Sequence, residues 1–171
     1  LWDGTTMTDL NSPANPDWVL ADASGINDSE KIVGAGTIGG NTMAFLYDAG
    51  AVTDLGALGT GTFSVASAIS NSDIVVGRAT NGEKYKAGLL QRNVIHGFTW
   101  QNGTMTDLGT LGGILSEAYN VNESGQVVGK ANYIDGNYIS YHAFLWDNGV
   151  MTDLNDLLPA GSDWELKEAR G

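Results

Sequence analysis

The chain contains no cysteine, which excludes disulfide frameworks, thiolate zinc sites and cysteine nucleophiles. Basic residues are also scarce: 8 lysines and arginines face 20 aspartates and glutamates, giving a formal charge of −12. Because this charge repels phosphate backbones and anionic membrane surfaces, we expect no nucleic-acid partner. No apolar run approaches the roughly 18 residues of a membrane span, so we expect no membrane insertion and a soluble chain.

One phrase occurs four times in the 171 residues. The copies are LWDGTTMTDL (1–10), AFLYDAGAVTDL (44–55), GFTWQNGTMTDL (97–108) and AFLWDNGVMTDL (143–154). Their closing leucines, Leu10, Leu55, Leu108 and Leu154, are 45, 53 and 46 residues apart. This period is typical of a small β-unit of about four strands, and residues 1–171 form one repeat domain.

A second block recurs between the phrases. It is ASGINDSEKIVGAG from Ala23, ASAISNSDIVVGRA from Ala66 and AYNVNESGQVVGKA from Ala118. Each block predicts two strands, a and b, and each phrase predicts two more, c and d. A fourth copy of the block starts near KEARG and stops at Gly171, so we expect the fourth repeat to lack its a–b hairpin.

The turn chemistry supports these strands. Asn102-Gly103 and Asn148-Gly149 lie between apolar runs, which is the strongest short-range signal for a two-residue type I′ hairpin. In the c–d block, Ala143 and Leu145 point to one side and Phe144 and Trp146 to the other, so both faces are apolar. A sheet with two apolar faces must be covered on both sides.

Together these features predict an all-β fold: a β-propeller-like array of four-stranded antiparallel blades, about four repeats of ~45–53 residues, the last incomplete. We expect aromatic side chains from strand c to form the core between blades. They are Trp2, Tyr47, Trp100, Trp146, Phe45, Phe98 and Phe144.

The segments HAFLWDNGVMTDL (142–154), GTLGG (109–113) and NESGQVVG (122–129) resemble the HAF repeat family of probable extracellular bacterial proteins. The signature His142-Ala143-Phe144 becomes Met43-Ala44-Phe45 and His96-Gly97-Phe98 in the other copies. The resemblance implies a propeller-like fold and an extracellular or cell-surface location, and no activity. Leu1 is followed directly by repeat sequence, so we expect any targeting peptide to have been removed or to lie outside this chain.

The residues do not support catalysis. His96 and His142 occupy the same position in neighbouring repeats, so we expect them to lie a blade apart, each hydrogen-bonded at the start of strand c. No G-x-S-x-G motif or phosphate-binding glycine loop is present. The recurring Asp9, Asp54, Asp107 and Asp153 are interpreted as hydrogen-bond anchors for the turn that follows. We expect a protein that is not an enzyme.

No cofactor and no metal site is predicted. The acidic DSE and WDNG segments leave calcium as an alternative, but neither has the spacing of a dedicated calcium loop.

The repeats differ most in their b–c connections. The distance from the glycine of strand b to the alanine or glycine of strand c is 10, 20 and 14 residues in successive repeats. The longest connection holds Lys84, Lys86 and Arg92, which we predict to bind ligand. The residues before each strand-a alanine include Asp22, Glu117 and Glu168, which would give one end of the blades a negative potential and bind a cation or a polyhydroxylated ligand.

We therefore hypothesise a secreted, non-enzymatic recognition or scaffold module that binds a glycan, a cell-wall component or a protein through the b–c and d–a loops. A second hypothesis is a structural subunit of an extracellular oligomer or filament that completes its unfinished blade with a neighbour. A carbohydrate-active enzyme working in a central channel is the third.

Overall fold

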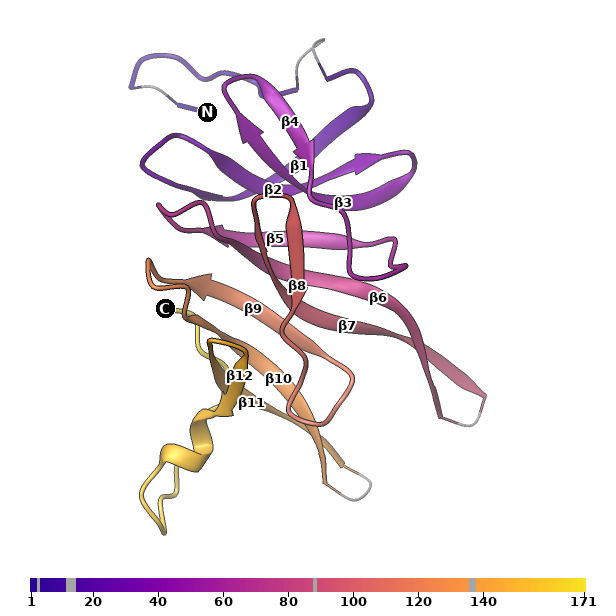
Figure 1. Cartoon of the computed structure of the whole chain (residues 1–171), viewed down its shortest axis with the longest axis vertical. Helices are drawn as coiled ribbons and strands as arrows, with labels where there is room; N and C mark the ends of the chain where they lie inside the picture. The colour runs from indigo at the N-terminus through magenta and orange to yellow at the C-terminus, as the bar shows by residue number, and fades with distance from the viewer. Residues whose placement is uncertain (3, 12–14, 88, 136–137) are drawn as a thin grey trace.

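The computed structural model describes residues 1–2, 4–11, 15–87, 89–135 and 138–171. These residues form three four-stranded antiparallel sheets and one short 3-10 turn (Figure 1). The predicted all-β class and the four-stranded antiparallel units are confirmed.

The first sheet is β1 (Trp18–Ile26), β2 (Ile32–Ile38), β3 (Asn41–Asp48) and β4 (Ala51–Asp54). The second is β5 (Ser64–Ile69), β6 (Val75–Ala87), β7 (Leu90–Gln101) and β8 (Thr104–Asp107). The third is β9 (Ser116–Val121), β10 (Val127–Asp135), β11 (Tyr138–Asp147) and β12 (Val150–Asp153), followed by η1 (Leu154–Leu157).

The three sheets follow one another along the long axis of the molecule in chain order (Figure 1). Each sheet is ordered as the chain runs, so every neighbouring pair is a hairpin. The first strand of each later sheet packs on the preceding sheet: β5 contacts β1, β2 and β3, and β9 contacts β5, β6 and β7. The repeat of the sequence is therefore a repeat of whole sheets.

The c–d hairpins close as predicted. Asn102 and Gly103 have φ of 51° and 81°, and Asn148 and Gly149 have 48° and 88°. Both residues of a type I′ turn require positive φ, and asparagine and glycine adopt it at little cost. Ala49 occupies the same position in the first sheet with φ of 47°, so the turn is kept there without asparagine.

A close backbone contact explains the glycine that recurs in the second strand of each sheet. A Cβ atom built on Gly34, Gly77 or Gly129 would overlap a first-strand carbonyl oxygen, that of Asp22, Val65 or Glu117 respectively. The first strand has a register shift at this point in all three sheets, which turns the carbonyl inward. The glycine is required by space rather than by a turn.

Apolar residues from facing sheets form two cores. Phe98 lies between the first and second sheets with Val33, Leu55 and Val75, and Phe144 lies between the second and third. Phe45, Phe98 and Phe144 are 1% exposed or less. Phe98 and Phe144 lie in the inter-sheet cores, as expected, whereas Phe45 belongs to neither of these two cores. Trp100 and Trp146 are half-buried and pack on the edges of these cores.

The expected burial of the whole Trp/Tyr position is wrong at one end of the chain. Trp2 is 57% exposed, because its short hairpin, bridged between Trp2 and Met7, has no sheet stacked against it among the described residues. Tyr47 is half-buried, since it faces away from the first inter-sheet core.

Two buried serines connect neighbouring sheets. Ser64 accepts a hydrogen bond from the Ala44 backbone N–H at 2.9 Å and donates one to the Gly56 carbonyl at 2.5 Å. Ser116 does the same between the Gly97 N–H and the Gly109 carbonyl, at 2.8 and 2.5 Å. Each hydroxyl thereby satisfies two buried backbone groups that have no ladder partner, which joins one sheet to the loop leading into the next.

The chain end continues the repeat without completing it. Residues 166–171 lie along the third sheet: the Ala143 N–H donates to the Leu166 carbonyl at 2.8 Å, and the Ala169 N–H donates to the Gly129 carbonyl at 3.1 Å. This segment occupies the place that β5 and β9 take on the sheets before them, but it is not a strand.

Replacing Gly77 with alanine is expected to destabilise the protein strongly. The added methyl would overlap the Val65 carbonyl and lie 3.0 Å from the Phe98 ring, and neither can move without shifting a strand. Overpacking of this kind costs about 1–3 kcal/mol, so we expect urea unfolding to show a loss of about 3 kcal/mol.

Gly97→Ala is the matched control. Gly97 aligns with Ala44 and Ala143, and its added Cβ would lie 3.2 Å from the Ala118 nitrogen. We expect a change of less than about 1 kcal/mol. Equal losses in the two variants would contradict the role assigned to the recurring glycine.

Candidate functional site

The variable b–c connections are extended β-hairpins rather than loops. Strands β6 and β7 have 13 and 12 residues and β10 and β11 have 9 and 10, whereas β2 and β3 have 7 and 8. The two longer hairpins leave the stack on the same side and end away from it (Figure 1). They start at the end of the sheets where β5 and β9 begin, because Ser64 pairs with Ala79 and Ser116 with Ala131.

The β6–β7 hairpin presents two different faces. Lys84 pairs with Asn93 and Lys86 with Gln91, so two ammonium groups and two amides share one face. The other face carries a single cross-strand pair, Tyr85 and Arg92. All six side chains are exposed, so neither face contributes to a core. The structure thus places the three predicted ligand-binding cations on one hairpin, the two lysines on one face and Arg92 on the other.

The β10–β11 hairpin is apolar where the β6–β7 hairpin is charged. Ile134 pairs with Ile139, and the two side chains are 43% and 50% exposed. Tyr141 pairs with Asn132 at the base and is 37% exposed. The sequence analysis did not single out these residues, although the run YIDGNYISY contains the alternation that could have identified a strand pair.

The two hairpins are fixed at their bases by one buried polar residue each. Thr80 accepts from the Thr62 N–H through its hydroxyl at 3.1 Å, and its own N–H donates to the Phe63 carbonyl. Asn132 is 1% exposed, and its Oδ1 accepts from the Ile114 and Leu115 N–H groups, both at 2.8 Å. Each residue therefore joins the base of its hairpin to the loop that precedes the first strand of the same sheet.

The predicted acidic positions lie at this same end, but they are not a purely negative surface. Glu117 forms ion pairs with Arg78 at 2.7 Å and with Lys130 at 3.7 Å. Glu168 pairs with Arg170 at 2.9 Å. Asp22 accepts a hydrogen bond from the Ser24 hydroxyl. The negative potential expected for this end is thus largely compensated around Glu117.

Aromatic rings pack around these ion pairs. The Lys130 ammonium lies 5.6 Å from the ring centre of Tyr119 and 5.4 Å from that of Tyr141, and the Arg170 guanidinium lies 4.6 Å from Tyr119. Burial works against the charge of Lys130, but its contacts with Tyr119 and Glu117 raise its pKa above the ordinary value. Lys130 therefore stays charged across the physiological range.

Sequence reasoning missed the cations because they come from other strands than the acid: Lys130 lies across the β9–β10 pair from Glu117, and Arg78 belongs to the preceding sheet. Arg78 pairs with Val65 and Lys130 with Glu117 in the β5–β6 and β9–β10 ladders. The signal was present in the block alignment, where Arg78 and Lys130 both follow the recurring glycine directly.

The two histidines form repeat-equivalent pairs with the recurring aspartates. The His96 Nδ1 lies 2.8 Å from Asp107 Oδ2, and the His142 Nδ1 lies 2.5 Å from Asp153 Oδ2. The pairs belong to different sheets, as predicted, and they do not converge on one site. Each links the middle of the third strand to the end of the fourth, which fits the structural role expected for these histidines.

The aspartates also anchor the following turns, as predicted. Gly56, Gly109 and Asn155 donate their backbone N–H groups to Asp54, Asp107 and Asp153 at 2.7–2.8 Å, and Asn11 does so to Asp9 at 3.0 Å. Partial burial favours the neutral acid in Asp153, but hydrogen bonds from His142 and Asn155 outweigh it and hold the pKa below the ordinary value. The pKa of Asp107 is lowered in the same way by His96 and Gly109.

The a–b hairpins form a polar ladder at the opposite end of the sheets. Asn71 accepts from the Asp28 N–H at 2.9 Å and donates to the Asp28 carboxylate at 2.7 Å. The Asn71 N–H donates to Glu123 at 2.9 Å, and the Ser72 hydroxyl donates to the same carboxylate at 3.0 Å. Hydrogen bonds thus run across all three sheets, which fixes their spacing at this end.

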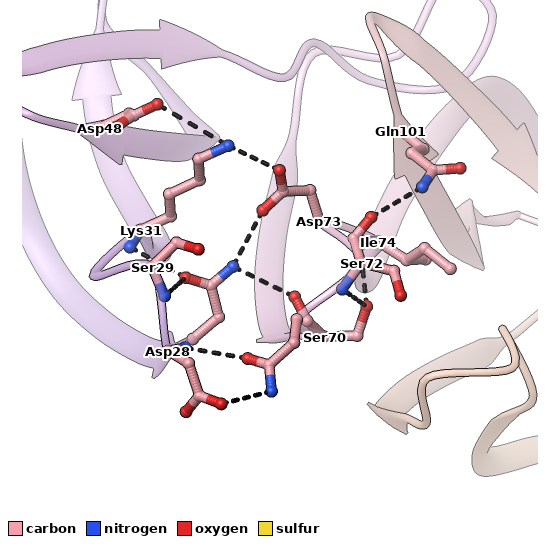
Figure 2. Close-up of polar contacts among 11 residues, drawn as sticks. Asp28, Ser29, Lys31, Asp48, Ser70, Ser72, Asp73, Ile74 and Gln101 are labelled. Atoms are coloured by element: carbon pink, nitrogen blue, oxygen red, sulfur yellow. Dashed lines mark hydrogen bonds and ion pairs between the residues drawn. The ribbon is translucent and has the colours of Figure 1, made fainter.

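One cation lies within this ladder. Figure 2 shows the Lys31 ammonium between the carboxylates of Asp48 and Asp73, at 3.8 and 2.6 Å. Asn27 is buried and donates to Asp73 at 2.9 Å and to the Ser70 carbonyl at 3.2 Å. The hydrogen bond from Lys31 to Asp73 raises the pKa of the ammonium. These side chains supply one another's hydrogen-bond and ion-pair partners, so we assign the ladder a structural role.

Among residues 1–2, 4–11, 15–87, 89–135 and 138–171, no group of three histidine or acidic side chains is placed to hold a metal ion. Within the same residues, no helix has the length and apolar character that crossing a membrane requires.

Replacing Asp153 with alanine is expected to cost more stability than replacing Asp54. Asp153 receives bonds from His142 and Asn155, whereas Asp54 receives the Gly56 N–H. Because hydrogen bonds to a charged group contribute about 1.5–3 kcal/mol, we expect Asp153→Ala to lose about that amount at neutral pH, and Asp54→Ala about 1 kcal/mol.

The difference should depend on pH. The folded-state pKa of Asp153 is depressed, so its contribution is complete above the unfolded value of 3.8 and is lost as the pH falls through the lower folded value. Urea unfolding at neutral pH and at about pH 3 measures this. A gap between wild type and Asp153→Ala that stays constant into acid would contradict the assignment.

Comparison with protein families gives one match, the family described as Protein of unknown function (DUF3466), over residues 58–171. No HAF repeat family is found, so the resemblance drawn from the repeated phrase was wrong. The extracellular or cell-surface location rested on that resemblance and stays a prediction. No curated protein and no solved structure is significantly similar. Since the match spans well over half of the sequence, the chain belongs to the family described as Protein of unknown function (DUF3466).

Proposed function

We propose that this protein is a non-enzymatic recognition module that binds a glycan, a cell-wall component or a protein through its two projecting b–c hairpins. The observation that carries the proposal is the exposure of both faces of the β6–β7 hairpin. An isolated two-stranded hairpin is at best marginally stable, so a ribbon that buries nothing against the body is a cost to folding. A binding role accounts for its retention.

The body of the protein supports this role as a rigid scaffold. The serine bridges, the polar ladder and the two inter-sheet cores connect all three sheets. Thr80 and Asn132 hold the hairpin bases against the loops beside them. Recognition commonly lies on extensions of this kind, because a fixed base positions the contacting side chains.

A propeller-like arrangement of the sheets is part of the proposal. The first strands are neighbours, since β1 contacts β5 and β5 contacts β9, which is the order expected for inner strands around a common axis. A Cβ on Gly25 would lie 3.1 Å from the Ala68 Cα, and Gly171 lies against Asn120 in the same way. In this arrangement both projecting hairpins belong to one face of the disc.

Shortening the β6–β7 hairpin should remove binding and leave the fold intact. Residues 85–92 would be replaced by Asn-Gly, so that Lys84 and Asn93 close a two-residue turn. Because the removed side chains that the structure describes are exposed, we expect the melting temperature to change by no more than about 4 °C. Binding would be measured on an array of glycans and cell-wall polysaccharides, with at least a tenfold loss expected for the ligand that the wild type retains.

Ile134→Ser/Ile139→Ser is the companion variant on the β10–β11 hairpin, where both side chains are exposed. It separates the contributions of the two hairpins. If the wild type binds a ligand and both variants bind it equally well, recognition lies elsewhere and the proposal fails.

Uncovered end surfaces favour a structural subunit as a second candidate. Val128 and Leu145 of the third sheet correspond to Val33 and Leu46, which pack against the second sheet. Here they line an open depression of about 360 Å³ together with Gly171. At the other end, Ile26 is 55% exposed. A contact between these unlike ends would be head-to-tail and would extend into a ring or a filament.

The second candidate predicts association that two single substitutions block. Ile26→Glu and Leu145→Glu would each leave one end of the molecule able to dock, so each variant alone should remain near 18 kDa while a mixture forms dimers. Sedimentation velocity over a range of concentrations measures this. A wild type that stays at 18 kDa throughout would exclude the candidate.

A further inference from the structure

The cations of this protein fall into two groups according to whether a carboxylate accompanies them. Five of the eight lysines and arginines form ion pairs within the described residues. These pairs are Lys31–Asp73, Arg78–Glu117, Lys130–Glu117, Lys167–Glu165 and Arg170–Glu168. The other three, Lys84, Lys86 and Arg92, all lie on the β6–β7 hairpin, and in the described part of the chain none of them pairs with an acid.

The distribution is unexpected for so acidic a chain. Acids outnumber bases 20 to 8, so a cation placed at random would find a carboxylate. Residues 83–93 carry three cations and only Glu83, a net charge of +2, which leaves −14 on the rest of a chain whose total is −12. The hairpin is thus a positive surface isolated on a negative body.

We propose that the β6–β7 hairpin binds an acidic polysaccharide, with its lysines and arginine on the carboxylate or sulfate groups of the sugar chain. This inference rests on the proposed recognition function and names its ligand class. The face that carries Lys84 and Lys86 also carries the amides of Gln91 and Asn93. Lys84 donates a hydrogen bond to the Asn93 side-chain oxygen, which holds the ammonium group on this face. Ammonium groups bind the anionic groups, and the amide of Gln91 and the amide nitrogen of Asn93 can hydrogen-bond to sugar hydroxyls.

The opposite face completes the chemistry. Tyr85 is 38% exposed and lies directly across from Arg92. An exposed aromatic ring offers an apolar surface for the CH groups of a sugar, and the guanidinium beside it can bind a carboxylate through two parallel hydrogen bonds.

The length of the hairpin separates its charge from the body. From Ile95 back to Leu90, which pair with Thr80 and Ala87, the strand covers about 17 Å at roughly 3.3 Å per residue. The screening length at physiological salt is about 8 Å, so the repulsion of the acidic body is largely screened at the tip. A stiff, densely charged duplex would extend back over the body and meet that repulsion, whereas a flexible polysaccharide can contact the hairpin alone.

The test measures binding of the full chain to polygalacturonate and to dextran sulfate, with neutral dextran as reference, at about 50 and 200 mM salt. We expect binding to at least one acidic polymer, with weaker affinity at the higher salt, and none to dextran. Lys84→Gln/Lys86→Gln/Arg92→Gln should lose binding at least tenfold. Polygalacturonate and dextran sulfate together show whether carboxylate or sulfate is preferred.

Lys86→Gln and Lys167→Gln form the matched pair. Each removes one positive charge from an exposed lysine, but Lys167 is paired with Glu165 and lies far along the chain from the hairpin. We expect several-fold weaker binding for Lys86→Gln and no change for Lys167→Gln. Equal losses would mean that only net charge matters, which overturns the inference.

Other outcomes are equally decisive. Absence of binding to both acidic polymers overturns the inference, as does preference for duplex DNA, poly-glutamate or phosphatidylglycerol vesicles over them. If the variant shortened at residues 85–92 loses a neutral ligand that the triple variant retains, the recognition function stands and the acidic ligand class is wrong. If neither variant alters any binding, both proposals fail.

Discussion

The architecture depends on a backbone contact in each sheet, where a carbonyl of the first strand points at a glycine of the second. No side chain fits at Gly34, Gly77 or Gly129, so the first two strands approach closely and the phenylalanine of the third strand packs over the same point. That phenylalanine fills the space to the preceding sheet at the two interfaces. The close approach of the first two strands, and the packing of the phenylalanine over them, follow from this contact, because a larger residue would force the strands apart.

The same repeat geometry explains why the two ends of the sheets differ. At the a–b end, hydrogen bonds from Asn71 reach Asp28 on one side and Glu123 on the other, so a longer hairpin would break the ladder. At the b–c end no such ladder exists between the described hairpins. Beyond Thr80 and Asn132 the chain has met its packing requirements, and strands can lengthen there without disturbing the stack.

Local patterns in the sequence were sufficient for the parts of the fold that depend on neighbours along the chain. The Asn-Gly turns, the four strands of each repeat and the anchoring aspartates were predicted because each involves residues a few positions apart. Contacts between strands were harder: Glu117 was expected to contribute a negative potential, but it pairs with Lys130 on the neighbouring strand and with Arg78 on the preceding sheet. The exposure of Trp2 could not be predicted from the repeated phrase either, since burial of the side chain at that position requires a sheet stacked against it. The family resemblance was wrong, because it rested on short phrases made mostly of turn and strand residues, which specify local structure more than a family.

Charge is the one property that the repeat does not distribute evenly. In the body each cation is held by a carboxylate, and several of these pairs also tie structural elements together, as Lys31 does between Asp48 and Asp73. Exposed ion pairs contribute little to stability singly, and Lys84 donates a cross-strand hydrogen bond to Asn93, but cations without a carboxylate partner add repulsion within their own hairpin. Lys84 and Lys86 lie on one face at the spacing of alternate strand residues, where like charges oppose each other. An arrangement that is unfavourable for the free protein becomes favourable when an anion lies across both ammonium groups, and the place where the repeat is interrupted is therefore where binding is expected.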